Sequence, residues 1–256
     1  MVLAIIQARF SSTRLPGKVL QPILGKPMLL LQIERIRRSA LIDQLLLATS
    51  TDPTDDPIER LCRENTIPCF RGSLNDVLDR FYQAAKPVRP DHVVRLTGDC
   101  PLTDYRLIDE IISFHLQGRF DYTSNTLDPT YPDGLDIEIV RFTCLEEAWR
   151  EAALPSQREH VTPFIHQQPD RFKLGSLKGQ TDLSRHRWTV DELEDFVLVT
   201  KVYEALYPQK PDFTTDDILN FLLKNPSVSG LNARFARNEG YQKSLIEDRR
   251  ILGTRG

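Results

Sequence analysis

The alternation of short apolar runs with amphipathic stretches over the first ~115 residues most constrains the fold of this chain. Residues 2–8 form a continuous apolar run, typical of a strand covered by helices on both faces. In residues 26–40 the apolar side chains recur with the helical period, and the charges lie opposite. The alternation of buried strands with amphipathic helices predicts an α/β fold, with a doubly wound, mostly parallel central sheet flanked by helices. Further strands are expected at 44–50, 68–72 and 92–99, and further helices at 55–65, 75–85 and 104–117.

This rhythm changes beyond residue 120, where turn-forming residues separate short β-like pieces. We expect one domain, residues 1–256, in which residues 126–185 form an insertion or excursion from the main sheet. The polar residues 226–256 are expected to form an arm or tail. Beyond residue 140 we expect helices at 143–153, 158–168, 192–207 and 214–225 and a short strand at 186–191.

Composition narrows the class of protein. With 40% apolar and 27% charged residues, the 256-residue chain is typical of a globular protein. A net charge of −3 argues against a broad surface for nucleic acid or an anionic membrane. The four cysteines form no CxxC pair, which disfavours a disulfide framework and a structural zinc site. The apolar start is too short for a signal peptide, and no stretch approaches the ~20 residues that span a bilayer, so we expect a cytoplasmic protein.

A cationic loop follows the first expected strand, at the edge where open α/β sheets bind their ligands. It holds Arg9, Arg14 and Lys18, together with small hydroxyl side chains such as Ser11 and Ser12. Clustered cations, hydroxyl groups and a flexible backbone suit a polyphosphate, so a nucleoside triphosphate is the expected ligand. The alternative is a solvated basic loop. The chain has neither a P-loop motif nor a GxGxxG fingerprint, which argues against kinase-like P-loop and nicotinamide chemistry.

Six segments, in order along the chain, resemble one family. They are IIQARFSSTRLPGKVLQPILGKPML (5–29), RGSLNDVLDRF (71–81), RLTGDCPL (95–102), YPDGLDIEIV (131–140), REHVTPFI (158–165) and RWTVDELEDF (187–196). The first and third resemble signatures of the sugar-activating cytidylyltransferases, which include the Kdo and acylneuraminate enzymes. The full set is most similar to the SpsF-type, spore-coat polysaccharide cytidylyltransferase-like family. The resemblance covers most of residues 2–200.

This resemblance implies a Rossmann-like nucleotide-diphospho-sugar transferase fold and a Mg2+-dependent cytidylyltransferase. CTP would activate a sugar acid, or a phosphate- or phosphonate-bearing small molecule, as its CMP or CDP derivative for surface polysaccharide biosynthesis, and pyrophosphate would leave. Two alternatives stay open. A metal-dependent glycosyltransferase shares the architecture, although GDCPLTD (98–104) lacks the usual DxD spacing. A non-catalytic nucleotide or sugar sensor would tolerate loss of Asp99 or Lys18, and both are present.

Two aspartates are candidate metal ligands. Asp99 ends an apolar strand, where a hard carboxylate oxygen suits Mg2+ on a triphosphate. The resemblance gives Asp99 the same role and matches Asp191 to the family's second metal-binding aspartate. Each has an alternative role as a cap, Asp99 for the helix that begins near Asp104 and Asp191 for the helix that follows it.

The resemblance and the loop chemistry together assign catalysis to Arg14, Lys18 and Asp99. For Arg71 and Ser73 the alternative is a capping and salt-bridge role. The expected nucleotide-binding residues are Ala8, Arg9, Ser11, Ser12, Arg14, Lys18, Arg71, Ser73 and Asp99.

Four residues are candidates for the acceptor side. Asp136 and Glu138 share one face of an extended segment and would bind acceptor hydroxyls or a second metal, unless they are gatekeeping acids on an exposed edge. Arg158 would meet an acceptor carboxylate or phosphate. His160 would act as a base, or be a satisfied interface histidine.

Related cytidylyltransferases are dimers built through the mid-chain segment, so the resemblance predicts a homodimer here through residues 126–185. Light scattering at micromolar concentration should give twice the mass of one chain. A monomer mass would contradict this expectation.

Overall fold

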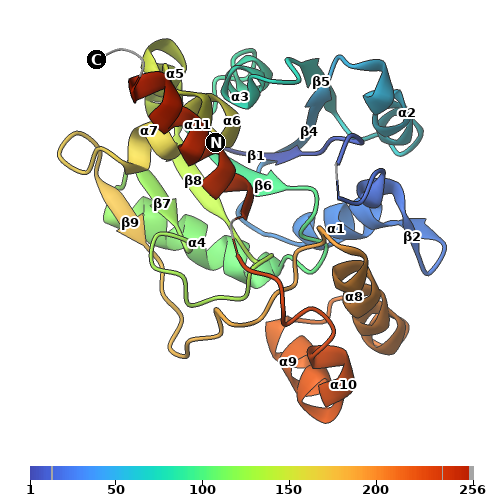
Figure 1. Ribbon diagram of the computed structural model, residues 1–256. Coiled ribbons are helices and arrows are strands. Elements are labelled where there is room, and N and C mark those ends of the chain that lie inside the picture. The colour runs from blue at the N-terminus through green and yellow to red at the C-terminus, as the bar shows by residue number, and fades with distance from the viewer. Residues whose placement is uncertain (13, 238, 254–256) are drawn as a thin grey trace.

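The computed structural model describes residues 1–12, 14–237 and 239–253. Within these residues a seven-stranded sheet has the order β5-β4-β1-β6-β8-β7-β9 (Figure 1). Neighbours among β5, β4, β1 and β6 are parallel, β8 is antiparallel to β6 and β7, and β7 and β9 are parallel. The mostly parallel α/β fold is therefore confirmed. The strands are β1 (Val2–Gln7), β4 (Gln44–Ser50), β5 (Cys69–Gly72), β6 (His92–Thr97), β7 (Tyr122–Ser124), β8 (Glu138–Arg141) and β9 (Leu174–Ser176), and β2 (Pro22–Ile23) and β3 (Lys26–Pro27) form a separate hairpin.

Helices cover both faces of the sheet. One core contains apolar residues of α1, α4 and α8, and the other contains residues of α3, α5 and α7. The helices are α1 (Met28–Ile36), α2 (Asp56–Glu64), α3 (Val77–Ala85), α4 (Tyr105–Gly118), α5 (Phe142–Glu151), α6 (Pro155–His160), α7 (Pro163–His166), α8 (Leu193–Leu206), α9 (Thr215–Lys224), α10 (Pro226–Ser229) and α11 (Glu239–Gly253), and 3-10 turns lie at Lys18–Leu20 and Pro53–Asp55.

The central strand β1 shows why this arrangement suits the sequence. Ala4 and Ile6 pack into one core and Leu3 and Ile5 into the other, and each is at most 1% exposed. An apolar run without alternation fits a strand with helices on both sides. The expected strand–helix alternation through residue 118 is confirmed, and all four cysteines are free thiols.

The segment expected as an insertion, residues 126–185, is not an excursion from the sheet. It supplies β8, which pairs with β6, and β9 at one edge. The single helix expected at 158–168 is wrong, because Val161 has a φ of 72° and separates α6 from α7. A left-handed φ is costly for a β-branched residue and does not continue a helix.

The strand expected at 186–191 is a loop held by backbone contacts to the turn after Pro132. Asp133 and Arg187 form an isolated bridge, and the Asp133 carbonyl accepts from Thr189 N at 3.0 Å. Gly134 has a φ of 101°, and a Cβ there would lie 2.3 Å from Thr189 N. The close approach of these two loops therefore requires glycine.

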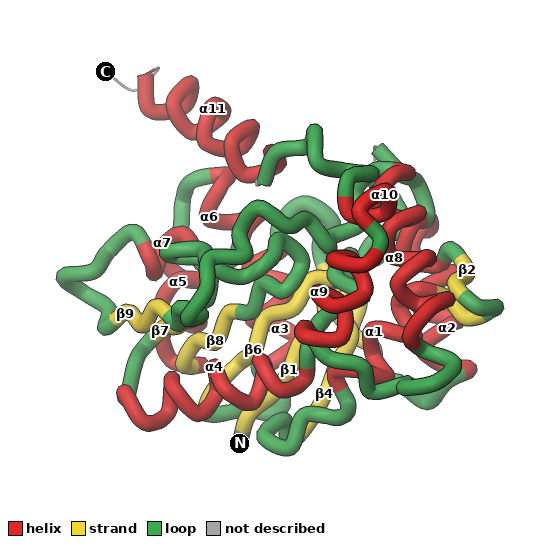
Figure 2. The backbone as a smooth tube through the Cα atoms, turned by 90° about the horizontal axis from the view of Figure 1, so that it is seen from below, coloured by secondary structure: helices red, strands yellow, loops and turns green. Residues whose placement is uncertain are grey.

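The C-terminal helix packs against α6. Helices α8, α9 and α10 lie together on one side of the molecule, and α11 lies on the other side beside α6 (Figures 1 and 2). Ser156 N at the start of α6 donates to the Asp248 carboxylate at 3.0 Å. The described part of the expected arm thus packs on its own chain. No helix among the described residues has the length and apolar character that a membrane crossing needs.

Gly134→Ala should destabilise the fold by about 3 kcal/mol or more, because the left-handed backbone costs about 1–3 kcal/mol and the new Cβ overlaps the facing loop. Gly25→Ala is the matched control, since Gly25 has a φ of 77° but its added Cβ meets nothing within 4 Å. It should cost only about 1 kcal/mol. Urea unfolding measures both, and equal losses would refute the packing argument.

Candidate active site

The cationic loop leaves β1 at the carboxyl edge of the sheet and is held from one side by a buried acid. Phe10 N donates to Asp55 Oδ1 at 2.6 Å, and Asp55 Oδ2 accepts from Ser50 N at 3.1 Å. Gly17, with a φ of 69°, then turns the chain so that Lys18 begins a 3-10 turn and is only 6% exposed. The first end of the loop is thereby tied to β4 through Asp55, and the second end is buried at Lys18.

The Lys18 ammonium lies between two carboxylates. Its Nζ donates to Asp99 Oδ2 at 3.0 Å, to Asp191 Oδ1 at 2.8 Å and to the Val190 carbonyl at 2.7 Å, which uses its three hydrogens. Burial lowers the pKa of Lys18, but the two carboxylates outweigh burial and raise it. Burial raises the pKa of Asp99, but Lys18 outweighs burial and lowers it. Lys18 and Asp99 are therefore both charged at neutral pH.

Neither candidate metal ligand is a helix cap. The N-cap of α4 is Asp104, and the N-cap of α8 is Glu192, with Asp195 completing a capping box. The capping interpretation is therefore wrong for both Asp99 and Asp191. Their side chains are 29% and 20% exposed, and both line the cavities described below.

Asp99 and Asp191 fit a divalent cation by their chemistry. Their hard carboxylate oxygens suit Mg2+, which usually keeps water and substrate phosphate oxygens as its other ligands. The described residues contain no group of three or more His, Cys, Asp or Glu side chains placed to hold a metal. The chain would thus supply part of the ligand shell and leave the rest to substrate and water.

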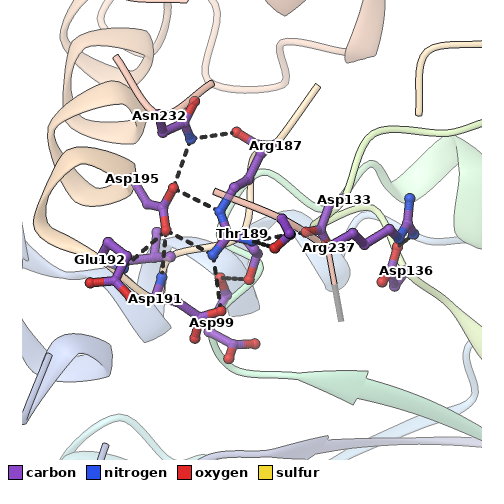
Figure 3. Close-up of polar contacts among 12 residues, drawn as sticks. Asp99, Asp133, Asp136, Arg187, Thr189, Asp191, Glu192, Asp195, Asn232 and Arg237 are labelled. Atoms are coloured by element: carbon purple, nitrogen blue, oxygen red, sulfur yellow. Dashed lines mark hydrogen bonds and ion pairs between the residues drawn. The ribbon is translucent and has the colours of Figure 1, made fainter. Parts of the chain in front are cut away.

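The buried Arg187 forms an ion pair with Asp191 and links it to neighbouring acids (Figure 3). Arg187 Nε and Nη2 donate to the two Asp195 oxygens at 3.0 and 3.1 Å, and Nη2 also donates to Asp191 Oδ2 at 3.1 Å. Its Nη1 donates to Asp133 Oδ2 at 3.1 Å. Asn232 Nδ2 joins Asp195 Oδ1 at 2.7 Å to the Arg187 carbonyl at 2.8 Å. This network fixes the backbone that carries Asp191.

The first cavity, of 440 Å³, lies at the carboxyl ends of β1 and β6. Arg9 is exposed to it and has no ion-pair partner among the residues that the structure describes. The Arg14 guanidinium lies 2.8 Å from Asp191 Oδ2 and 3.5 Å from Glu192 Oε1. Of the expected nucleotide-binding residues, the lining includes Ala8, Arg9, Ser12, Arg14, Lys18 and Asp99.

The second cavity, of 510 Å³, adjoins the first on the side of β8. Asp136 and Glu138 both line it, in agreement with their shared face. Burial raises the pKa of Asp136 to about 7, although its ion pair with Arg237 opposes the rise. Burial raises the pKa of Glu138, but Arg95 together with the hydrogen bonds from Thr162 and Tyr122 outweighs burial and lowers it. The two cavities share Gln7, Arg14, Thr97, Asp99, His160 and Asp191, so they meet at the two carboxylates.

The structure does not bring every expected residue to this site. Arg71 donates to two backbone carbonyls at 2.8 and 3.0 Å and pairs with acids of α2. Arg158 Nε donates to both Asp76 oxygens at 3.0 and 2.9 Å, and Ser73 Oγ accepts from Asp76 N at 3.0 Å. Ser11, Arg71, Ser73 and Arg158 line neither cavity in the described chain.

Sequence reasoning missed Arg80, which is 2% exposed and lines the first cavity. Its Nη1 donates to the Ser73 carbonyl at 2.7 Å, and its Nε has no partner among the described residues. Burial lowers the pKa of Arg80, and the nearby positive charge of Arg9 lowers it further, to about 10. The sequence did contain a signal for Arg80, because it lies beside Phe81 on the apolar face of the predicted helix, where a charged residue is unexpected. Tyr241 and Ser244 of α11 were also missed, and no local pattern marks them.

Several known proteins are similar to this chain in sequence and in fold. A family model described as Cytidylyltransferase matches residues 3–222. An uncharacterized protein of Methanocaldococcus jannaschii is 37% identical, over 94% of this chain and 98% of its own length. The spore coat polysaccharide biosynthesis protein SpsF of Bacillus subtilis is 35% identical, over 89% of this chain and 96% of its own. A solved cytidylyltransferase structure from Leptospira borgpetersenii gives a TM-score of 0.84 with 34% identity, over 89% of this chain and 96% of its own.

Lys18→Met should destabilise the fold by about 3–5 kcal/mol, because it leaves two neighbouring carboxylates without their ammonium. Lys26→Met is the matched control. Lys26 pairs with Glu34 at the surface, where its side chain is 46% exposed, so its loss should cost at most about 1 kcal/mol. Urea unfolding at pH 7 in EDTA measures both, and equal costs would contradict the bridging role.

The difference in unfolding free energy between wild type and Lys18→Met should depend on pH. Lys18 has a raised pKa, so its contribution is present below its ordinary value of 10.5 and is lost as pH rises through the folded value. Asp99 has a lowered pKa, so its contribution is present above its ordinary value of 3.8 and is lost as pH falls through the folded value. The stability gap between wild type and Lys18→Met should therefore be flat from about pH 5 to 10 and shrink outside that range.

Proposed function

We propose, because the chain belongs to the cytidylyltransferase family, that it transfers a cytidylyl group from CTP to a small-molecule acceptor and releases pyrophosphate. The observation that carries the proposal is the Lys18 bridge between Asp99 and Asp191, at the boundary of two adjoining cavities. One cavity would hold the nucleotide and the other the acceptor. The reacting atoms would then meet beside the two carboxylates.

Positive charge supports the first cavity as the triphosphate site. Arg9, Arg14 and Arg80 line its wall at the carboxyl edge of the sheet. At an effective dielectric constant of ~20, each close charge pair contributes roughly 4 kcal/mol before desolvation is subtracted. Several cations together would hold a polyphosphate against its strong hydration.

In the proposed reaction, an acceptor oxygen in the second cavity attacks the α-phosphorus of CTP in line, and pyrophosphate leaves on the far side. Arg9 and Arg14 would hold the phosphates in position, and Lys18 would keep Asp99 charged and hold Asp99 and Asp191 in alignment. Asp99 and Asp191 would hold Mg2+, which when bound supplies charge neutralisation on the triphosphate. Ordered positive and negative groups would thus supply most of the rate enhancement.

The product is proposed to be a CMP- or CDP-activated precursor for surface polysaccharide biosynthesis. The printed role of the Bacillus subtilis relative, spore coat polysaccharide biosynthesis, supports this proposal. The lining of the second cavity, with Asp136, Glu138 and Thr126, would bind a hydroxylated small molecule through hydrogen bonds.

Thermal shifts with Mg2+ and each of CTP, UTP, ATP, GTP, UDP-glucose and GDP-mannose test the proposal. CTP at about 100 times its dissociation constant should stabilise the fold by about 2.7 kcal/mol, a rise in Tm of roughly 5 to 10 °C. Arg9→Gln should reduce this shift, because Arg9 faces the cavity. Arg71→Gln should keep CTP affinity, because Arg71 lines neither cavity. A shift only with nucleotide sugars would overturn the proposal in favour of a glycosyltransferase.

A further inference from the structure

His160 stands where the two cavities meet. It is the last residue of α6 and lines both cavities, and its side chain is 25% exposed. The next residue, Val161, has a φ of 72°, which ends the helix at this point. A side chain at this junction is positioned between the proposed nucleotide and acceptor sites.

Two hydrogen bonds determine which ring nitrogen of His160 carries the proton. Ser244 Oγ donates to Glu159 Oε2 at 2.7 Å, and it lies 2.9 Å from His160 Nε2. A carboxylate accepts hydrogen bonds and donates none, so the Ser244 proton is directed to Glu159. We therefore assign the Ser244 oxygen as the acceptor of a hydrogen bond from His160 Nε2–H. The Nδ1 atom is left with its lone pair, and no hydrogen bond to Nδ1 occurs among the described residues.

The surroundings keep this imidazole neutral. Burial lowers the pKa of His160, Arg95 lowers it further, and nearby carboxylates raise it by less, so the pKa lies below its usual value of 6.5. The groups that face His160 are Arg95 of β6, Glu138 of β8, Glu159 of α6, and Asp248 and Tyr241 of α11. A neutral imidazole with an available Nδ1 lone pair is able to accept a proton at physiological pH.

The charges of the second cavity favour an un-ionised reacting group. Arg14, where the two cavities meet, is assigned to the triphosphate, and the other arginines of the second cavity, Arg95 and Arg187, are each ion-paired with a buried acid. An ionised phosphate or phosphonate oxygen would have to displace a carboxylate from one of these two arginines. A hydroxyl group needs only a hydrogen-bond partner, but it must lose its proton as it attacks.

We propose that His160 is the general base for an acceptor hydroxyl and that Ser244 and Glu159 are positioning residues that fix its tautomer. This inference rests on the proposed function and narrows it to acceptors that react through a hydroxyl group. His160 Nδ1 takes the hydroxyl proton while the oxygen bonds to the α-phosphorus of CTP. The bond from that phosphorus to the bridging oxygen breaks, and pyrophosphate leaves with the electron pair. The imidazolium then returns its proton to water.

The tautomer is testable without any acceptor. Long-range proton–nitrogen spectra of the full chain with 15N-labelled histidine report the protonation of each ring nitrogen, and His160→Gln assigns the signal among the five histidines. We expect the Nε2–H form at pH 7.5, and a mixture of tautomers in Ser244→Ala. The Nδ1–H form or an imidazolium at pH 7.5 would overturn the proposal.

Pyrophosphate release then tests the chemistry. 3-Deoxy-manno-octulosonate and N-acetylneuraminate are the hydroxyl probes, and 2-aminoethylphosphonate is the ionised probe. With a hydroxyl probe, His160→Gln should lower kcat by about 10²–10⁴-fold. Glutamine retains a donor near the Nε2 position, so the CTP-induced thermal shift should survive. His186→Gln, outside both cavities, should keep full activity.

The two proposals fail in different ways. Loss of the CTP shift in the wild type overturns the proposed function, while the histidine spectrum still reports the tautomer. Turnover with 2-aminoethylphosphonate alone, or full activity of His160→Gln, overturns the role of His160 and leaves CTP binding intact. If no probe turns over, the spectrum alone decides.

Discussion

One buried ammonium group holds the site together. Asp99 and Asp191 come from loops far apart in the chain, and two carboxylates this close repel each other unless a cation lies between them. Lys18 provides that cation, and Arg14 and Arg187 contact the other oxygen of Asp191. Fixed cations therefore hold Asp99 and Asp191 close together, and Lys18 keeps Asp99 ionised. The proposed divalent metal needs ionised carboxylate oxygens as ligands.

The sequence predicted site residues best where they lie in a loop directly after a recognisable buried strand. The apolar run of β1 places the cationic loop at the ligand edge, so Arg9, Arg14, Lys18 and Asp99 could be found from position and charge. Arg71 and Arg158 could not be separated from them, because their acidic partners come from packed helices that no local pattern reveals. The sequence at 186–191 predicts a short strand, yet in the structure this stretch makes one isolated bridge and no ladder.

Both cavities take part of their walls from beyond the family match. That match ends at residue 222, whereas Tyr241 of the second cavity and Ser244 of the first lie on α11. The cations of the first cavity all lie inside the matched region. Helix α11 therefore completes the walls of both cavities, although it lies outside the matched region.

The ion pair between Lys18 and Asp191 is expected to form late in folding. Lys18 and Asp191 are 173 positions apart, so their contact closes a very long loop, and such contacts form late because their loop-closure entropy is large. The parallel strands β1, β4, β5 and β6 all lie within the first 97 residues and can pair while the rest of the chain is still being synthesised. A ribosome that has made only the first half of this protein would therefore carry most of the parallel sheet, with Lys18 and Asp99 in place but the second carboxylate still unmade.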